Sequence, residues 1–168
     1  MSKTPKYWSK AVKFLAKKDK VMKRLILKYK DKTLTTRKDI FFSLCKSIIG
    51  QQISVAAANS VFNKFSKLCN GRLNSSTVNK LSFQKIKKCG LSRQKTRGIK
   101  ELAFKFEKGS FDKLKIKKMN DEQAIIYLSS LRQIGRWSAE MVLIFNLNRP
   151  NIWPIQDIGL LRAISNNY

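Results

Sequence analysis

The chain has 168 residues, a formal net charge of +26 at pH 7 and no histidine. Without histidine, Ser-His-Asp and Cys-His catalysis and any His-ligated metal site are excluded, so acid–base chemistry falls to the ten carboxylates and the lysines. Hydrophobic residues make up 43% of the chain, which argues against disorder, and the length suffices for one domain with a buried core.

The charge predicts a polyanionic partner, because nucleic acid that binds Lys and Arg releases its counterions. Two alternatives explain the same charge: lysine enrichment from an AT-rich genome, or a basic RNA-binding or ribosome-associated protein. Cys45, Cys69 and Cys89 are too widely spaced for a CxxC metal clip and favour a reducing compartment. Because neither a secretory signal nor a long apolar run occurs, we expect a soluble intracellular protein that does not bind membranes, in the cytoplasm (nucleoid) or the nucleus.

Apolar residues recur at helical spacing along the chain and no segment alternates as a strand, so the predicted fold class is all-α. The predicted helices span 8–30 (two helices with Asp19 as the cap between them), 40–50, 54–68, 76–81, 82–88, 93–108, 121–131, 137–147 and 157–166. Asp, Asn and Thr residues before several of these segments are candidate N-caps: Asp19, Thr35, Thr36, Asp39, Asn120 and Asp121. Asn70 and Gly71 predict a left-handed end for the helix 54–68.

Two C-terminal features are candidates for chemistry. Residues 128–145 read as two helices joined around Gly135, where free backbone N–H groups and the helix dipole can bind phosphate. The alternative is a plain αα-hairpin that needs Gly135 only for its backbone angles. Asp157 is the only carboxylate after Glu140, and its structural alternative is a helix N-cap.

Four segments, in order along the chain, resemble the helix-hairpin-helix (HhH-GPD) DNA glycosylase superfamily and, within it, the 3-methyladenine DNA glycosylase II (AlkA-like) branch. They are FSLCKSIIGQQIS (42–54), CGLSRQKTRGIKELA (89–103), IGRWSAEM (134–141) and WPIQDIGL (153–160). The resemblance implies a bundle of two helical subdomains, with a helix-hairpin-helix motif, around a cleft that receives a base flipped out of duplex DNA.

The resemblance also implies an activity. Asp157 matches the family's catalytic aspartate, which stabilises the oxocarbenium-like sugar or orients the attacking water. Trp137 stands where bifunctional relatives carry a Schiff-base lysine, so the chain resembles the monofunctional branch, without β-lyase activity. Trp137 and Met141 are then expected to line the base pocket, with Trp137 offering its face to a cationic base. A core position beneath the hairpin is the alternative for Trp137.

Further residues match DNA-contacting positions of the family. One of Gln51, Gln52 and Ile53 is expected to fill the gap left by the flipped base, although a polar helix end is the alternative. The remaining DNA-binding candidates are Lys95 and, in the hairpin, Gln133, Gly135, Arg136 and Ser138. The family usually has glycine at the position of Gln133, so we expect strain there. We expect no cofactor, apart from a monovalent cation that the hairpin can bind, and no iron–sulfur cluster, which would need four close cysteines.

We expect one HhH-GPD domain over residues 1–168 that lacks the family's C-terminal helices. The predicted function is monofunctional base excision repair: hydrolysis of the N-glycosidic bond of alkylated purines, of the 3-methyladenine and 7-methylguanine class, by a monomer acting on damaged duplex DNA. The alternative is a noncatalytic basic helix-hairpin-helix DNA-binding protein, which would bind duplex DNA without releasing a base.

Overall fold

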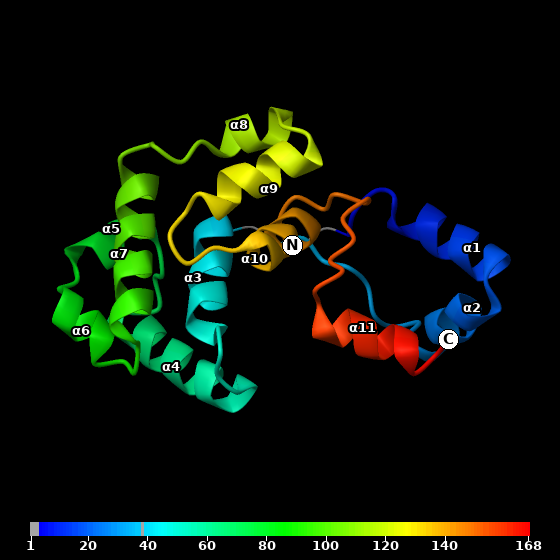
Figure 1. Cartoon of the computed structure of the whole chain (residues 1–168), viewed down its shortest axis with the longest axis horizontal. Coiled ribbons are helices and arrows are strands. Elements are labelled where there is room, and N and C mark those ends of the chain that lie inside the picture. The colour runs from blue at the N-terminus through cyan, green and yellow to red at the C-terminus, as the bar shows by residue number, and fades with distance from the viewer. Residues whose placement is uncertain (1–3, 38) are drawn as a thin grey trace.

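The computed structural model describes residues 4–37 and 39–168, and every regular element in that part of the chain is a helix. The helices are α1 (Trp8–Lys18), α2 (Lys20–Lys28), α3 (Ile40–Gly50), α4 (Val55–Leu68), α5 (Ser75–Lys80), α6 (Phe83–Lys87), α7 (Arg93–Glu107), α8 (Lys113–Lys118), α9 (Asp121–Ser129), α10 (Arg136–Phe145) and α11 (Ile158–Ser165). The all-α prediction is confirmed. Figure 1 shows two groups of helices, a large lobe of α3–α10 and a small lobe of α1, α2 and α11.

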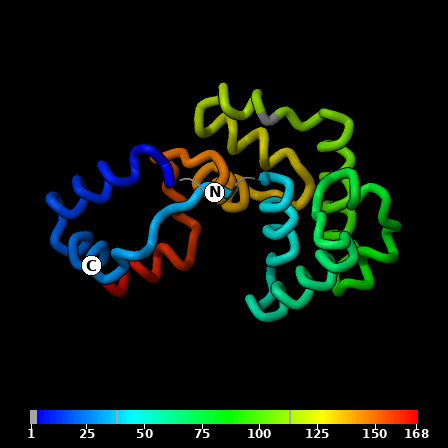
Figure 2. Tube along the Cα trace, turned by 180° about the vertical axis from the view of Figure 1, so that it is seen from behind, coloured from blue at the N-terminus to red at the C-terminus, as the bar shows by residue number. Residues whose placement is uncertain are grey.

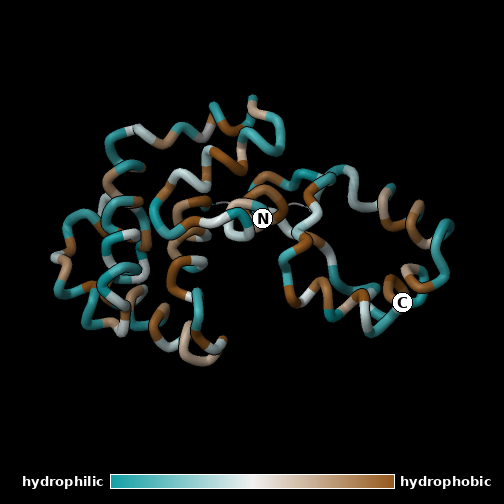
Figure 3. The backbone as a smooth tube through the Cα atoms, in the orientation of Figure 1, coloured by the Kyte–Doolittle hydropathy of each residue, from teal (hydrophilic) through white to brown (hydrophobic). Residues whose placement is uncertain are grey.

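The hydrophobic core lies in the large lobe. Helix α3 is its most apolar element, with six buried residues, and it packs against α4, α7 and α10. Figure 3 shows hydrophobic stretches along α3 and α10, which lie beside each other. In contrast, none of the residues of α1, α2 and α11 is buried. The large lobe therefore contains the packed core, and the small lobe is held by fewer contacts.

Of the predicted N-caps, Asp19, Asp39 and Asn120 form, whereas α3 is not capped by Thr35 or Thr36, and Asp121 is the first residue of α9. The carboxylates of Asp19, Asp39 and Asp157 accept hydrogen bonds from backbone N–H groups three residues ahead, and so begin α2, α3 and α11. Asn120 begins α9 with a complete capping box. The helix ends lie within two residues of the predicted ends, and Gly71 has the left-handed φ, 71°, expected after α4.

Helix α8 was not predicted. Its lysines alternate with apolar residues, a pattern without clear helical period, and it has only six residues. Asp112 caps its first turn, and Arg149 donates hydrogen bonds to the carbonyl oxygens of Ile116 (2.7 Å) and Met119 (2.8 Å) at its end. Arg149 also pairs with Asp121 at 2.7 Å. Tertiary contacts therefore stabilise a helix that its own sequence does not specify.

The C-terminal end of the chain contacts α2 and its N-cap in the small lobe. Asn167 accepts a hydrogen bond from Arg24 of α2 at 3.2 Å, and the Tyr168 hydroxyl donates to Asp19 at 2.8 Å. Figure 2, seen from behind, likewise places α11 beside α2. Over the described residues, no helix has the length and apolar character needed to cross a membrane.

Arg149→Met should unfold more easily than the parent, because three acceptors at the junction of α8 and α9 lose their donor. We expect a loss of about 1–3 kcal/mol in the free energy of unfolding, measured by urea denaturation. Arg162→Met, at an exposed position of α11, is the matched control and should stay within about 0.5 kcal/mol. Equal losses in the two variants would contradict this role for Arg149.

Candidate active site

The hairpin between α9 and α10 leaves the start of α10 open. Gly135 is the N-cap of α10 and cannot accept a hydrogen bond through a side chain, and intrahelical bonding begins with the N–H of Ala139. Its φ of −93° is ordinary, and a Cβ built there would meet nothing within 4 Å. The hairpin therefore does not need Gly135 for its backbone angles, and phosphate binding at this turn stays a prediction.

The strained residue of the hairpin is Gln133. Its φ of 65° lies in the left-handed region, where the family's usual glycine fits better and a side chain costs about 1–2 kcal/mol. The Gln133 side chain packs on Gly98 of α7, where an added Cβ would come within 2.9 Å of it. Its carbonyl oxygen accepts a hydrogen bond of 2.6 Å from the Gln51 side chain. Gln51 and Gly98 together hold the turn in place.

The three predicted gap-filling residues lie in the turn between α3 and α4 and differ in their contacts. The half-buried Gln51 side chain is hydrogen-bonded to the hairpin, whereas Gln52 is exposed with φ of 55° and Ile53 is 41% exposed. Of these three described residues, Gln52 and Ile53 therefore have the side chains that are free to contact DNA. Insertion into DNA stays a prediction for them.

Three predicted DNA-binding side chains are engaged within the protein. The Lys95 ammonium donates to the carbonyl oxygens of Ile49 (2.9 Å) and Gln51 (2.6 Å), and burial lowers its pKa. Ser138 is buried and shares a 2.7 Å hydrogen bond with Ser47 of α3.

The third side chain is that of Arg136, which forms a two-pronged ion pair with Glu122 at 2.7 and 2.8 Å and also contacts Glu140. These side chains therefore fasten α3, α7, α9 and α10 together. Their phosphate contacts stay predictions. Most of their internal partners lie on other elements, far away in the chain, and could not be predicted from local patterns.

Asp157 lies directly beside the hairpin. One carboxylate oxygen accepts from the Leu160 N–H at 2.7 Å, as an N-cap, and the other accepts from the Trp137 indole N–H at 2.8 Å. The Leu160 N–H and then the Trp137 N–H hold the pKa of Asp157 below its ordinary value. The carboxylate is thus both the N-cap and an ionised group fixed next to Trp137.

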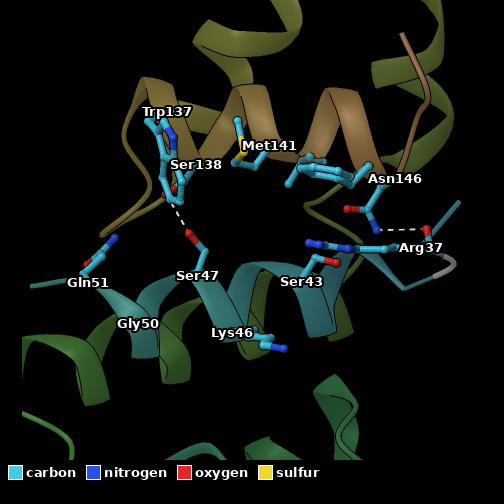
Figure 4. Close-up of a pocket in the computed structure, with 12 residues that line it drawn as sticks. Arg37, Ser43, Lys46, Ser47, Gly50, Gln51, Trp137, Ser138, Met141 and Asn146 are labelled. Carbon is cyan, nitrogen blue, oxygen red and sulfur yellow. Dashed lines mark hydrogen bonds between the residues drawn. The ribbon is translucent and has the colours of Figure 1, made fainter. Parts of the chain in front are cut away.

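A pocket of about 350 Å³ opens between α3 and α10 (Figure 4). Trp137 and Met141 line it from α10. Trp137 is 41% exposed, so the alternative of a core tryptophan is wrong. The other lining residues are Arg37, Ser43, Lys46, Ser47, Gly50, Gln51, Ser138, Val142, Phe145 and Asn146.

Arg37 and Asn146 were not predicted from the sequence as pocket residues. The two residues are far apart in the chain, and neither belongs to a recognisable motif. The Asn146 amide donates to the carbonyl oxygens of Arg37 (3.0 Å) and Asp39 (3.2 Å), which joins the end of α10 to the start of α3. Within the described residues, no group of three or more His, Cys, Asp or Glu is placed to hold a metal.

The described residues form an all-α frame with an open helix-hairpin-helix turn, and the Asp157 carboxylate is bonded to Trp137, which lines the adjoining pocket. This arrangement defines a helix-hairpin-helix class of fold. Residues 45–168 match the family model described as HhH-GPD superfamily base excision DNA repair protein. The chain belongs to this superfamily.

Known proteins resemble the chain over most of its length. It is 29% identical over 140 residues to DNA-3-methyladenine glycosylase 1 of Schizosaccharomyces pombe, covering 82% of this chain and 61% of the relative. It is 34% identical over 139 residues to the DNA-3-methyladenine glycosylase of Saccharomyces cerevisiae, covering 77% and 47%. The solved 3-methyladenine DNA glycosylase of S. pombe in complex with abasic DNA matches with a TM-score of 0.77 and 26% identity, over 95% of this chain and 82% of that one. The chain thus spans about half to three fifths of these two curated relatives.

Trp137→Phe should raise the pKa of Asp157 toward its ordinary value, because the indole donor is lost while the ring and the Leu160 donor remain. A lowered folded-state pKa stabilises the protein above about pH 4, and that stability is lost as the pH falls through the folded pKa. The variant should therefore lose part of this stability above about pH 4. Carbon-13 NMR titration of the Asp157 carboxyl measures the shift.

Trp153→Phe is the matched control, since the Trp153 side chain is 65% exposed. It should leave the pKa of Asp157 where it is. A Trp137→Phe variant with an unchanged Asp157 pKa would show that the indole hydrogen bond has no electrostatic effect.

Proposed function

We propose that the chain is the core of a monofunctional DNA glycosylase that hydrolyses the N-glycosidic bond of alkylated purines, of the 3-methyladenine and 7-methylguanine class, after flipping the base from duplex DNA. The observation that carries the proposal is the Asp157 carboxylate, held by the Trp137 indole at 2.8 Å beside the pocket. Relatives named 3-methyladenine glycosylases and an abasic-DNA complex of one such enzyme support it.

The hairpin is the proposed anchor on the DNA backbone. Within the described residues, the N–H groups of Arg136, Trp137 and Ser138 have no intrahelical acceptor, and no side chain caps them. Free N–H groups and the positive end of the helix dipole bind a phosphate. Gly135 has an ordinary φ and open space around it, so the absence of a side chain there leaves room for a phosphate to approach.

The α3–α4 turn is the proposed wedge. Gln52 and Ile53 are free to enter the base stack, and Gln51 ties this turn to the hairpin carbonyl of Gln133. This hydrogen bond would keep the turn that fills the base gap at a fixed distance from the hairpin that binds the phosphate. The flipped base would enter the pocket between α3 and α10, against the face of Trp137.

Asp157 suits an electrostatic role better than that of a general base. Both of its oxygens accept hydrogen bonds, and its lowered pKa keeps it ionised but weakly basic. A fixed negative charge stabilises the cationic sugar that forms as the base departs. Trp137 has no amine to form a Schiff base, so we propose hydrolysis without strand cleavage.

The surface charge supports duplex DNA as the partner. Between Ile40 and Lys100 the sequence contains no Asp or Glu but many Lys and Arg residues, and this segment includes the α3–α4 turn. We propose that the protein acts as a monomer, as one domain over residues 1–168, where cellular DNA lies: the nucleoid or the nucleus. Its binding should weaken steeply with salt.

A monovalent cation at the hairpin also belongs to the proposal. The Ser129 hydroxyl, at the end of α9, is buried without a partner among the described residues. This hydroxyl and backbone carbonyls of the turn would hold the ion, since oxygen donors suit hard cations. When bound, it would add positive charge beside the phosphate.

Gly135→Ala should fold as stably as the parent, within about 1 kcal/mol, because a Cβ finds open space there. Its affinity for duplex DNA should fall about tenfold, as expected if the methyl group pushes a phosphate off one charge-assisted hydrogen bond. Fluorescence anisotropy over a salt series measures both the affinity and the slope against salt. The slope should stay the same, because N–H contacts release no counterions. Unchanged affinity would rule out a phosphate at this turn.

The glycosylase activity is tested with duplex DNA containing 7-methylguanine, by single-turnover release of the free base. Asp157→Asn keeps a capping oxygen but loses the charge, so release should slow by about 10²-fold or more while the melting temperature changes little. Asp112→Asn makes the same change at the N-cap of α8 and should match the parent.

Release by Asp157→Asn at the parental rate would falsify the role of Asp157. If the parent binds duplex DNA with no preference for damaged sites and releases no base, the protein is instead a noncatalytic DNA-binding protein.

A further inference from the structure

The pocket carries a positive charge at the end opposite Trp137. Figure 4 shows the Arg37 side chain extending between α3 and α10. Its guanidinium carbon lies 4.3 Å from the ring centre of Phe145. The Arg37 backbone is also fixed, since its N–H donates to the Phe145 carbonyl at 2.7 Å and its own carbonyl accepts from Asn146 at 3.0 Å. Stacking and backbone bonds therefore hold the guanidinium at this place.

Two buried polar atoms beside Arg37 have no hydrogen-bond partner among the described residues. They are the side-chain oxygens of Ser43 and Asn146, both of which line the pocket. The orientation of Asn146 is set, because its amide nitrogen already donates to two carbonyls. Unpaired buried polar atoms are few in native proteins, so this cluster fits a polar ligand better than an apolar one.

The positive charge of Arg37 and the negative charge of Asp157 lie at opposite ends of the pocket. The other cation of the lining is Lys46, whose ammonium instead lies 5.7 Å from the ring centre of Phe62 on α4. Among the described lining residues there is no carboxylate, and Asp157 is reached only through Trp137 at the opposite end. A flipped nucleotide with its sugar near Asp157 would thus direct the far edge of its base toward Arg37.

We propose that Arg37 is a second catalytic residue, which binds the far edge of the flipped purine and stabilises the electron pair of a base that leaves as an anion. This inference rests on the proposed glycosylase function. It adds a second catalytic residue, whose charge is opposite to that of Asp157.

The step balances without a further reactant. The bond from the sugar C1′ to the purine N9 breaks, and its electron pair goes to the base while positive charge develops on the sugar. Asp157 faces the cation, and Arg37 faces the base anion through hydrogen bonds to N7 and O6. Water then adds its oxygen to C1′, and its proton ends on the departed base. Opposite fixed charges at the two ends match the charge separation of the transition state.

The charge of the lesion decides how much Arg37 contributes. A 7-methylguanine base is already cationic, has lost N7 as an acceptor and leaves as a neutral base. Hypoxanthine is neutral, offers both O6 and N7, and must leave with the full electron pair. Opposite thymine it is also mispaired and therefore easier to flip than guanine in a normal pair. Arg37 should thus matter far more for hypoxanthine than for 7-methylguanine.

The test compares single-turnover release of hypoxanthine, placed opposite thymine, and of 7-methylguanine, placed opposite cytosine, from duplexes with the same flanking sequence. We expect the parent to release both, and Arg37→Met to slow hypoxanthine about 10²-fold but 7-methylguanine less than about tenfold. Arg37→Lys, which keeps the charge, should recover part of the hypoxanthine rate. Lys46→Met removes one charge from the same lining and should leave the ratio of the two rates unchanged. Thermal unfolding of each variant checks that it is folded.

The outcomes distinguish a failure of this inference from a failure of the proposed function. Release of 7-methylguanine without hypoxanthine, or an equal slowing of both by Arg37→Met, overturns the role of Arg37 and leaves the glycosylase function standing. Release of neither base by the parent overturns the glycosylase function and the inference with it. A selective loss of hypoxanthine release in Arg37→Met supports both.

Discussion

The hydrogen bond from the Trp137 indole to Asp157 is the contact on which the site depends. It joins the first turn of α10, in the large lobe, to the N-cap of α11, in a lobe whose helices bury no residue. Without it, the carboxylate would be fixed only by its own helix. With it, the Trp137 side chain lines the pocket with its ring and donates its indole N–H to the Asp157 carboxylate. In the proposed function, Trp137 would therefore set both the position of the base and the position of the charge.

A second set of contacts relates the proposed DNA anchor to the proposed wedge. Gln51 donates to the carbonyl of Gln133, and Lys95 donates in turn to the carbonyl of Gln51. Gly98 provides the space that the Gln133 side chain fills. The left-handed Gln133 is thus supported from α3 and α7, which explains how the hairpin keeps its shape without the usual glycine. Gln51 and Lys95, which were predicted to touch DNA, thus also hold the loops of the proposed anchor and wedge.

The sequence predicted what depends on local patterns. Apolar periodicity located nearly all the helices, and capping chemistry identified Asp39 and Asp157 as helix starts, because both signals lie within one turn of chain. Helix α8 was missed because Arg149, far along the chain, completes it. For the site, motif order found Trp137 and Asp157 but not their hydrogen bond, and it could not find Arg37, whose stacking on Phe145 arises only when α3 packs across α10. Partners separated in sequence leave no local signal.

The most direct test of the fixed charge at Asp157 uses two duplexes that differ only in the sugar at one site. One carries a cationic pyrrolidine that imitates the departing sugar's charge, and the other carries a neutral tetrahydrofuran. A site built for the cationic transition state should bind the pyrrolidine duplex at least about 10²-fold more tightly, and Asp157→Asn should abolish that preference. Equal affinity of the parent for the two duplexes would contradict an electrostatic role for Asp157.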